Sequence, residues 1–479
     1  MNYSIIRYII CRVLEFQALF LLLPCLVALA YREQAGWAYL AVMAGCFLVG
    51  NLGKRKKPSS HVFYAREGFV TVSLSWIILS VTGALPFRIS GEISSYTDAL
   101  FETISGLTTT GSSILTNVEA LSYCNLFWRS FTHWIGGMGV LVLILAILPL
   151  AGGYNMHLMR AESPGPSVGK LVPRVKLTAQ ILYGIYMAMT LLLIVLLLCT
   201  GMNFFEAITH AFGTAGTGGF GVLNSSMAEY SVPAQAVITI FMILFGINFN
   251  VYYLFLIRKP KDAVKHEEMR CFLLIILASV ALITWNIRGM FGSLFEAFHH
   301  AAFQVASIIT TTGFATTDFN LWPSFSRTIL VLLMFVGACA GSTGGGIKVS
   351  RVVILLKMVK NEISHMIHPK RVTHVRFENH VISKEISRSV QVFLISYIAI
   401  FVVSVLSVSL CGLDLTTNFT AVAATLNNIG PGLNEVGPSG NFSVFADPAK
   451  WVLMFDMLAG RLEIFPMLVL LTPSTWKRG

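Results

Sequence analysis

The sequence carries little charge for its length. Only 12% of its 479 residues are Asp, Glu, Lys or Arg, about half the fraction that is usual in a soluble protein. Hydrophobic residues make up 55% of the chain, and the mean hydropathy is +0.72. These values exclude an ordinary soluble domain and predict an integral membrane protein.

Catalytic and metal-binding patterns are also missing. The eight cysteines include no CxxC pair, and most of them lie in apolar stretches, where free cysteine behaves as a small buried hydrophobe. The histidines form no HExxH motif, and no nucleophile stands at helical spacing from a base. We therefore expect neither an enzyme nor a resident cofactor.

Two glycine-rich motifs look like nucleotide sites but lack the required context. Residues 216–221 (GTGGFG) match GxGxxG, yet no βαβ unit surrounds them. Residues 341–348 (GSTGGGIK) resemble a phosphate-binding loop, yet Ile347 separates the last glycine from Lys348, and Val349 replaces the usual Ser or Thr. We expect no nucleotide to bind this chain.

Long apolar stretches dominate what the sequence does contain. About 20 mostly apolar residues cross a bilayer, and the chain has many stretches near that length: 14–30, 36–52, 67–87, 134–151, 178–199, 234–257, 271–287, 389–411 and 451–472. The stretch 327–360 is also long enough but is interrupted. The protein is therefore predicted to cross the membrane many times.

The net charge of +11 fits a membrane orientation rather than a nucleic-acid partner. With residue 1 in the cytoplasm and each span crossing once, 26 of the 34 basic residues lie inside. Six lie outside and two within the membrane: Arg32, Arg88, Arg129, Arg288, Arg327 and Lys450, then Lys348 and Arg461. This is the positive-inside pattern.

The first apolar stretch has two interpretations. Arg7 and Arg12 precede an apolar run that ends in Ala28-Leu29-Ala30, as in a cleavable signal peptide. Its removal would invert the orientation and place the basic residues 54–57 outside. We therefore expect this helix to be retained.

Four segments between the long stretches align on a glycine. They are FETISGLTTTGSSI with Gly111, ITHAFGTAGTGGFG with Gly218, FQVASIITTTGFAT with Gly313, and TAVAATLNNIGPGL with Gly430. Each joins a short helical run to a small polar run, a combination tolerated at membrane depth only where protein buries it or water lines it. Ordinary turns are the alternative, but four aligned segments on the poorly basic side favour four re-entrant loops around one axis.

Such loops suit a dehydrated potassium ion. A potassium filter replaces water with rings of main-chain carbonyl oxygens, and glycine reaches the required backbone angles without a Cβ penalty. The residues before the glycines are Thr110, Thr217, Thr312 and Ile429. No carboxylate stands at the glycine positions, as a divalent-cation filter would need.

The predicted fold is an all-α membrane protein with four tandem helix–pore-helix–filter–helix repeats around a pseudo-four-fold pore. Two transmembrane helices precede them. The division of the chain that we expect is 1–60, 61–160, 161–265, 266–385 and 386–479.

The interruption after the third segment predicts a gate. Residues 341–346 are Gly341, Ser342, Thr343, Gly344, Gly345 and Gly346, with Lys348 following. Glycine is a poor helix former, and broken helices at membrane depth line cavities or gates. A close helix contact between Gly337 and Gly341 is the alternative interpretation.

Arg461 is predicted to face the pore below the fourth segment, where it would oppose cations. An arginine inside a membrane helix needs water or a partner, so a structural salt bridge to Glu463 or Asp456 is the alternative. Asn248 and Asn250 either line the same cavity or bond across helices.

The four glycine segments, GSTGGGIK (341–348) and GRLEIF (460–465) together resemble the Trk/Ktr/HKT superfamily of potassium transporters. The two extra N-terminal helices make the chain most similar to its TrkH/TrkG branch. The resemblance implies potassium uptake across the bacterial inner membrane, with filter glycines at 111, 218, 313 and 430, a gating loop at 341–346 and a pore-facing Arg461. It also implies a homodimer in the lipid bilayer and a cytosolic TrkA-type regulatory subunit that binds nucleotides.

Two points of selectivity follow from the same resemblance. Glycine in the first filter resembles potassium-preferring members, whereas sodium-selective plant relatives carry serine there. Gly216 and Gly221 make the second filter unusually glycine-rich. A Ktr-like sodium-dependent or weakly selective transporter and an ion-coupled symporter therefore remain alternatives, whereas alternating access would require inverted repeats.

Overall fold

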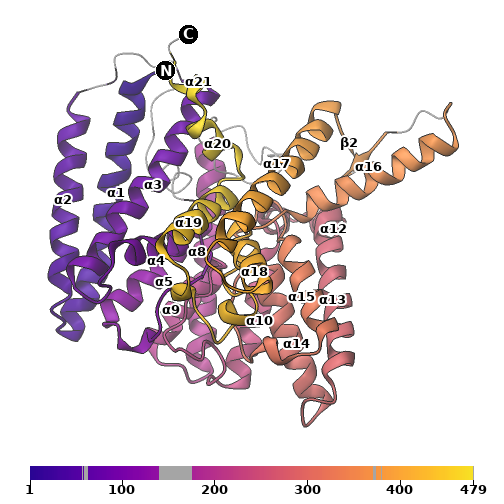
Figure 1. Ribbon diagram of the computed structural model, residues 1–479, viewed down its shortest axis with the longest axis horizontal. Coiled ribbons are helices and arrows are strands. Elements are labelled where there is room, and N and C mark those ends of the chain that lie inside the picture. The colour runs from indigo at the N-terminus through magenta and orange to yellow at the C-terminus, as the bar shows by residue number, and fades with distance from the viewer. Residues whose placement is uncertain (57, 59–62, 140–174, 371–373, 379, 478–479) are drawn as a thin grey trace.

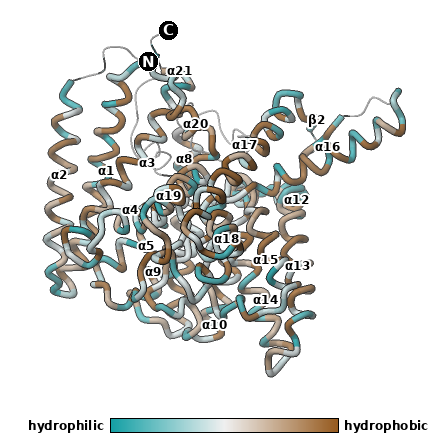
Figure 2. Tube along the Cα trace, in the orientation of Figure 1, coloured by the Kyte–Doolittle hydropathy of each residue, from teal (hydrophilic) through white to brown (hydrophobic). Residues whose placement is uncertain are grey.

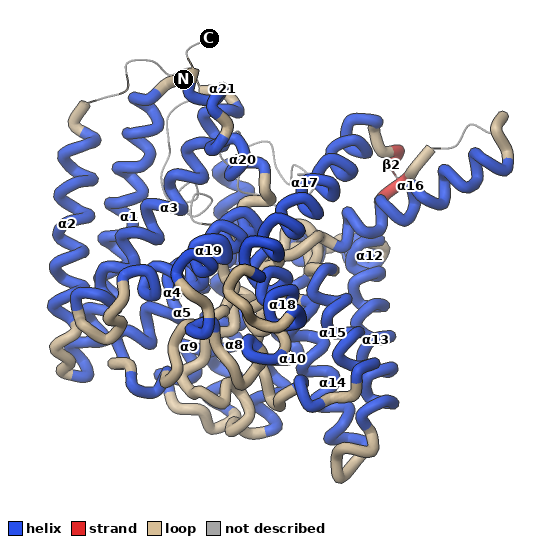
Figure 3. The backbone as a smooth tube through the Cα atoms, viewed as in Figure 1, coloured by secondary structure: helices blue, strands red, loops and turns tan. Residues whose placement is uncertain are grey.

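The computed structural model describes residues 1–56, 58, 63–139, 175–370, 374–378 and 380–477. In this part of the chain nearly all regular structure is helical, and the one sheet is the hairpin of β1 (Arg376–Phe377) and β2 (His380–Val381). Long helices surround a centre of shorter helices and loops, as Figures 1 and 3 show. The predicted all-α membrane fold is confirmed.

In the part of the chain that the structure describes, six helices are long and apolar enough to cross a membrane. They are α1 (Tyr3–Tyr31), α2 (Gly36–Lys54), α3 (Ala65–Ile89), α8 (Val175–Cys199), α13 (Glu267–Ile287) and α17 (Lys384–Ser409). Hydrophobic residues run along these outer helices in Figure 2. Each of them matches a predicted span. The predicted span 134–151 begins in α5 (Tyr123–Gly137), and its residues beyond 139 lie outside the described part.

Helix α1 packs against α2, α3 and α5. Its buried Gln17 donates from Nε2 to the Leu79 carbonyl in α3 at 3.0 Å, and Thr82 donates to Gln17 Oε1 at 2.5 Å. The N-terminal helix is therefore an integral part of the helix bundle.

The four short helices that precede the glycine-aligned segments all begin with a side-chain cap. They are α4 (Tyr96–Leu107), α9 (Phe204–Ala215), α14 (Leu294–Ile309) and α18 (Leu415–Leu426). A side-chain oxygen of the preceding residue accepts from the third main-chain N–H of each helix, and these residues are Ser95, Asn203, Ser293 and Asp414. Such caps satisfy otherwise unbonded helix donors, so each short helix has a fixed start.

Among the described residues, three of the helices that follow the short helices are broken, two of them against expectation. The predicted span 234–257 is α10 (Val232–Gly246) and α11 (Phe249–Leu256), bent by 89°. The predicted span 451–472 is α19 (Asp447–Arg461) and α20 (Phe465–Leu471), separated by Glu463 and Ile464 at positive φ. Asn248 causes the first break, because its side-chain oxygen accepts from Asn250 N at 2.9 Å and starts a new helix.

The break after the third segment is longer than predicted. Helix α15 (Ser324–Phe335) ends before Val336, and α16 (Val349–Ile367) begins after Lys348. We call residues 336–348 the intramembrane loop. Its two arms bond to each other, with Gly337 N donating to Ile347 O at 2.8 Å. The remaining short helices are α12 (Pro260–Val264), α21 (Pro473–Trp476) and single 3₁₀ turns at Val118–Ala120, Phe319–Leu321, Asn434–Val436 and Phe442–Val444.

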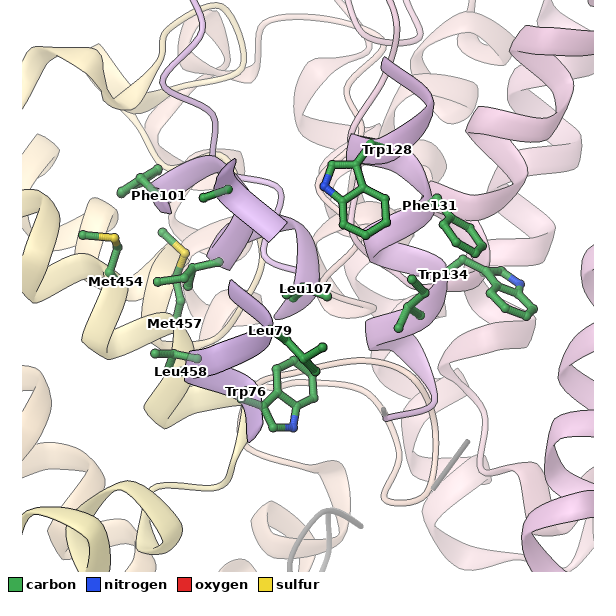
Figure 4. Close-up of a cluster of buried hydrophobic side chains, with 14 of the residues drawn as sticks. Trp76, Leu79, Phe101, Leu107, Trp128, Phe131, Trp134, Met454, Met457 and Leu458 are labelled. Atoms are coloured by element: carbon green, nitrogen blue, oxygen red, sulfur yellow. The ribbon is translucent and has the colours of Figure 1, made fainter. Parts of the chain in front are cut away.

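Helix α4 is enclosed by neighbouring apolar side chains. Figure 4 shows Phe101 and Leu107 of α4 between Met454 and Met457 of α19 on one side and the aromatic residues of α5 on the other. Trp128 of α5 is buried and donates from Nε1 to the Gly83 carbonyl at 3.0 Å. Helix α4 therefore packs directly against both α5 and α19.

A buried ion pair joins α4 to α5. Glu102 and Arg129 are 1% and 2% exposed, and Arg129 Nε donates to Glu102 Oε1 at 2.8 Å. Glu102 also accepts from Ser113 Oγ at 3.0 Å and Ile114 N at 3.1 Å, while Arg129 donates to Gly221 O at 3.2 Å. Arg129, which the predicted orientation places on the outer side of the membrane, is thus buried beside its carboxylate partner rather than exposed.

Removing one member of this pair should destabilise the protein more than replacing both. Arg129→Leu leaves a buried carboxylate without its cation, a change that costs about 3–5 kcal/mol. The double variant Glu102→Gln/Arg129→Leu removes both charges and should recover more than half of that loss. The measurement is the unfolding free energy in detergent micelles, with exposed Arg288→Leu as the control. Glu102→Gln is the second single variant. If the stability losses of the two single variants simply add up to the loss of the double variant, the pair is not coupled.

Candidate cation pathway

The short helices lead into four segments with one backbone pattern. We call these glycine segments 1 to 4: residues 108–113, 216–221, 310–315 and 427–432. In each, a residue with φ between +53° and +59° is followed two positions later by a glycine with φ between +80° and +105°. The first residues are Thr109, Thr217, Thr311 and Asn428, and the glycines are Gly111, Gly219, Gly313 and Gly430.

This pattern corrects the alignment of the second segment by one residue. The main-chain N–H before each glycine bonds the carbonyl five residues earlier: Thr110 to Ser105, Gly218 to Gly213, Thr312 to Ser307, and Ile429 to Ala424, at 2.8–2.9 Å. Gly219 therefore corresponds to Gly111, while Gly218 corresponds to Thr110 and Thr217 to Thr109. This segment contains several neighbouring glycines, and aligning the sequences by residue type alone selected Gly218 instead of Gly219.

The four segments close into a ring. A Cβ atom built on Gly111 would lie 2.0 Å from Gly218 O, and one on Gly219 would lie 2.1 Å from Thr312 O. The corresponding distances are 2.2 Å from Gly313 to Ile429 O and 2.9 Å from Gly430 to Thr110 O. Each glycine thus abuts the carbonyl of the next segment, and the fourth returns to the first. We call this arrangement the carbonyl ring.

The surroundings of the ring favour a cation. All four short helices end at it, and the C-terminal end of a helix carries partial negative charge. The four ring glycines also line a cavity of about 150 Å³, whose other walls include Ser112, Asn224 and Arg129. A desolvated cation at the ring would meet carbonyl oxygens rather than carboxylates.

His133 of α5 packs against the second glycine segment. It is fully buried, its Nε2 accepts from Phe220 N at 3.2 Å, and its Nδ1 lies 2.8 Å from Gly106 O. Because Nε2 accepts, Nδ1 carries the proton and donates to the carbonyl. A Cβ atom on Gly218 would lie 2.3 Å from the imidazole ring. The histidine therefore occupies the space that a side chain fills in the other segments.

Segments 1 and 4 are joined by side chains. Asn428 Nδ2 donates to Thr110 Oγ1 at 3.0 Å and to Met457 O at 2.9 Å. Ser112 Oγ donates to Gly430 O at 2.9 Å. Asn428 thus links the ring to α19, the helix that carries Arg461.

The intramembrane loop lies directly against the base of the ring. Gly345 N donates to Thr311 Oγ1 at 2.6 Å. A Cβ atom on Gly344 would lie 2.9 Å from Thr310 O, and one on Gly345 would lie 2.5 Å from Asn427 O. The glycines of the loop therefore permit close contact with the ring, in addition to any freedom of movement they confer. Lys348, which is buried, donates to the Gly344 and Gly345 carbonyls.

Arg461 connects α19 to the intramembrane loop and to the end of α5 beneath the ring. Its guanidinium donates to Thr343 O at 2.9 Å in the loop, to Gly137 O at 2.6 Å at the end of α5, and to Gly136 O. Glu463 pairs with Arg351 of α16, and Asp456 accepts from Ser404 at 2.7 Å. The cavity beside Arg461, Lys348 and the loop glycines is only about 10 Å³, so these groups pack closely beneath the ring.

Sequence reasoning missed three supporting residues: Glu102, Arg129 and His133. A carboxylate inside the apolar short-helix segment was a signal that a buried cation must lie nearby. Asn248 does reach the loop, since a Cβ atom on Gly341 would lie 3.1 Å from its Oδ1. Among the described residues, no group of three or more His, Cys, Asp or Glu could hold a metal ion.

Known proteins match nearly the whole chain. The TrkH family model, described as a cation transport protein, matches residues 38–477. The Trk system potassium uptake protein TrkH of Vibrio parahaemolyticus is 39% identical over 99% of both chains, and TrkG of Escherichia coli is 35% identical over 96% of both. The crystal structure of the potassium transporter TrkH from V. parahaemolyticus matches with a TM-score of 0.90 and 36% identity, covering 100% of both chains.

These matches confirm the predicted superfamily and branch, and a transporter rather than an enzyme. Together with the six apolar helices they confirm a multi-pass membrane protein. The chain belongs to the TrkH family of cation transport proteins.

Proposed function

We propose that this protein takes up potassium ions across the bacterial inner membrane through the carbonyl ring. The observation that carries the proposal is the closed contact of each ring glycine with the carbonyl of the next segment. Main-chain oxygens fixed in this way can replace the hydration shell of a monovalent cation. Relatives named as potassium uptake proteins cover nearly the full chain.

In this proposal the intramembrane loop is the gate. Residues 341–346 and Lys348 lie beneath the ring, and the loop is anchored there by hydrogen bonds that can break and re-form. Arg461 is the barrier to cations, because its charge and its bonds to three carbonyls fill the space below the ring. Opening requires both the loop and Arg461 to move aside.

We also propose a homodimer formed through α16 and α17. These helices project from the body of the protein in Figure 1. One face of α16 exposes Leu356, Val359, Ile363 and Met366, each more than half accessible, at the spacing of a single helical stripe. An apolar stripe on a projecting helix with charged residues beside it suits a second copy better than lipid alone.

A cytosolic regulatory subunit completes the proposed system. The relatives are named as parts of a Trk system, so further subunits are expected. The cytoplasmic turn around α12 exposes Arg258, Lys259, Lys261 and Lys265, a basic surface suited to an acidic face of a TrkA-type nucleotide-binding protein.

Flux in liposomes tests the function. Purified protein should carry rubidium or potassium down a gradient with no added substrate, and sodium should compete weakly. Flux that appears only with an imposed proton or sodium gradient would instead support the coupled alternative. Equal flux of potassium and sodium would contradict a selective carbonyl ring.

Replacing a ring glycine should reduce potassium-over-sodium selectivity, and the loss should be larger where the new Cβ atom lies closer to a carbonyl oxygen. Gly111→Ser places a Cβ atom 2.0 Å from a carbonyl oxygen, whereas Gly430→Ser places it at 2.9 Å. Both residues also have positive φ, which strains a serine. We expect the potassium-to-sodium flux ratio to fall roughly tenfold for Gly111→Ser and less for Gly430→Ser.

Gly184→Ser in α8 is the matched control, because a Cβ atom there meets nothing within 4 Å. It should leave the flux ratio unchanged. An unaltered ratio in folded Gly111→Ser protein would be incompatible with the ring as the selectivity filter.

Removing the charge of Arg461 should raise flux. Arg461→Ala abolishes the bonds to the Thr343, Gly136 and Gly137 carbonyls, and we expect roughly tenfold higher rubidium flux, the effect of losing about one charged hydrogen bond. Arg461→Lys keeps the positive charge but lacks the several N–H donors of the guanidinium. Its flux should therefore lie between that of the parent and that of Arg461→Ala. Parent-like flux in well-folded Arg461→Ala protein would refute the barrier role.

A further inference from the structure

One buried carboxylate holds the base of the intramembrane loop. Glu268, in the first turn of α13, is 2% exposed. Its Oε1 atom accepts two main-chain hydrogen bonds, from Ala340 N at 2.7 Å and from Ser350 N at 2.9 Å. Ala340 lies just before the glycine-rich part of the loop and Ser350 just after it. A single oxygen atom therefore joins one arm of the loop and the first turn of α16 to α13.

These hydrogen bonds stabilise both the Glu268 carboxylate and the main-chain N–H groups that it accepts from. Ser350 lies in the first turn of α16, where main-chain N–H groups lack helical acceptors and negative charge is stabilised. A carboxylate at this depth needs such donors, and charge-assisted hydrogen bonds are stronger than neutral ones. Moving the loop away from α13 would leave all three groups unpaired.

The cytoplasmic hairpin of β1 and β2 forms hydrogen bonds with the same turn of α13. Glu378, between the two strands, accepts from Glu268 N at 3.1 Å, and its own N–H donates to Glu267 Oε2 at 3.3 Å. His266 Nδ1 lies 2.9 Å from Glu378 Oε1. Lys357 of α16 contacts Glu267 and donates to the main chain of the hairpin at 2.8 Å. Polar contacts thus run without interruption from the cytoplasmic surface to the loop.

From these contacts we infer that Glu268 is the positioning residue that keeps the intramembrane loop closed, and that the cytoplasmic hairpin keeps Glu268 in place. The inference rests on the proposed function, because it takes the loop to be the gate. The carboxylate touches neither the carbonyl ring nor Arg461 among its hydrogen bonds. Its removal should therefore open the pathway and leave selectivity intact.

Two substitutions at this position separate the bond from the charge. Glu268→Gln keeps a side-chain oxygen that can accept from both N–H groups, whereas Glu268→Ala removes it. In purified protein without a cytosolic partner, rubidium flux should rise roughly tenfold for Glu268→Ala and stay within about twofold of the parent for Glu268→Gln. The potassium-to-sodium ratio should not change. Exposed Glu385→Ala, in the first turn of α17, is the control.

Cys339 reports loop movement without relying on flux. It lies beside Ala340 and is fully buried. A water-soluble maleimide, with the labelled peptide identified by mass, should modify Cys339 roughly tenfold faster in Glu268→Ala than in the parent or in Glu268→Gln. Glu378→Ala, which loosens the hairpin from a more accessible position, should give a smaller increase in the same direction.

The outcomes are distinguishable. Parent-like labelling and parent-like flux in folded Glu268→Ala protein overturn the inference. Faster labelling with parent-like flux supports Glu268 as the residue that positions the loop and overturns the loop as the gate. If Glu268→Ala does not fold, the test passes to Glu378→Ala, where parent-like labelling overturns the role of the hairpin and, with it, the proposed polar connection.

Discussion

The structure depends on one steric constraint, the absence of space for a Cβ atom at four glycines. Each glycine lies so close to the carbonyl of the next segment that any side chain would displace the main chain. Contact around the full ring means that no segment can shift alone, because it would open one junction and compress another. The capped short helices, the buried ion pair and the broken inner helices all serve to hold four polar segments in this arrangement within the bilayer.

The ring is regular in its backbone but irregular in its support. Nine residues before the ring glycines stand Glu102, His210, Gln304 and Ala421, and only the first forms a buried ion pair. Gln304 is fully buried, and neither of its side-chain polar atoms has a hydrogen-bond partner among the described residues. The four segments are thus supported by different side chains. In the glycine-rich second segment, His133 fills the space beside Gly218.

Composition and periodicity were enough to predict the long helices, the short helices that lead into the four glycine segments and the break before α16, because each depends on local sequence. The register of the second segment was not predictable, since it is decided by the imidazole ring of a different helix. The bend after Gly246 carries no proline signal, and a single Asn side chain produces it. The break after Arg461 did carry one: Pro466 stands in the first turn of α20, the position that proline favours at a helix start.

The same close packing supports the proposal that so short a loop closes the pathway. The loop glycines approach the carbonyls at the base of segments 3 and 4, so even a small displacement breaks the contact outright rather than weakening it gradually. Arg461 bonds at once to the loop and to the end of α5, and Glu268 bonds to the loop and to the first turn of α16. In the proposed gate these bonds are lost together, so we expect two distinct states of the loop rather than a continuum. Regulation from the cytoplasm then needs to offset only a few charged hydrogen bonds, an amount within reach of one binding event.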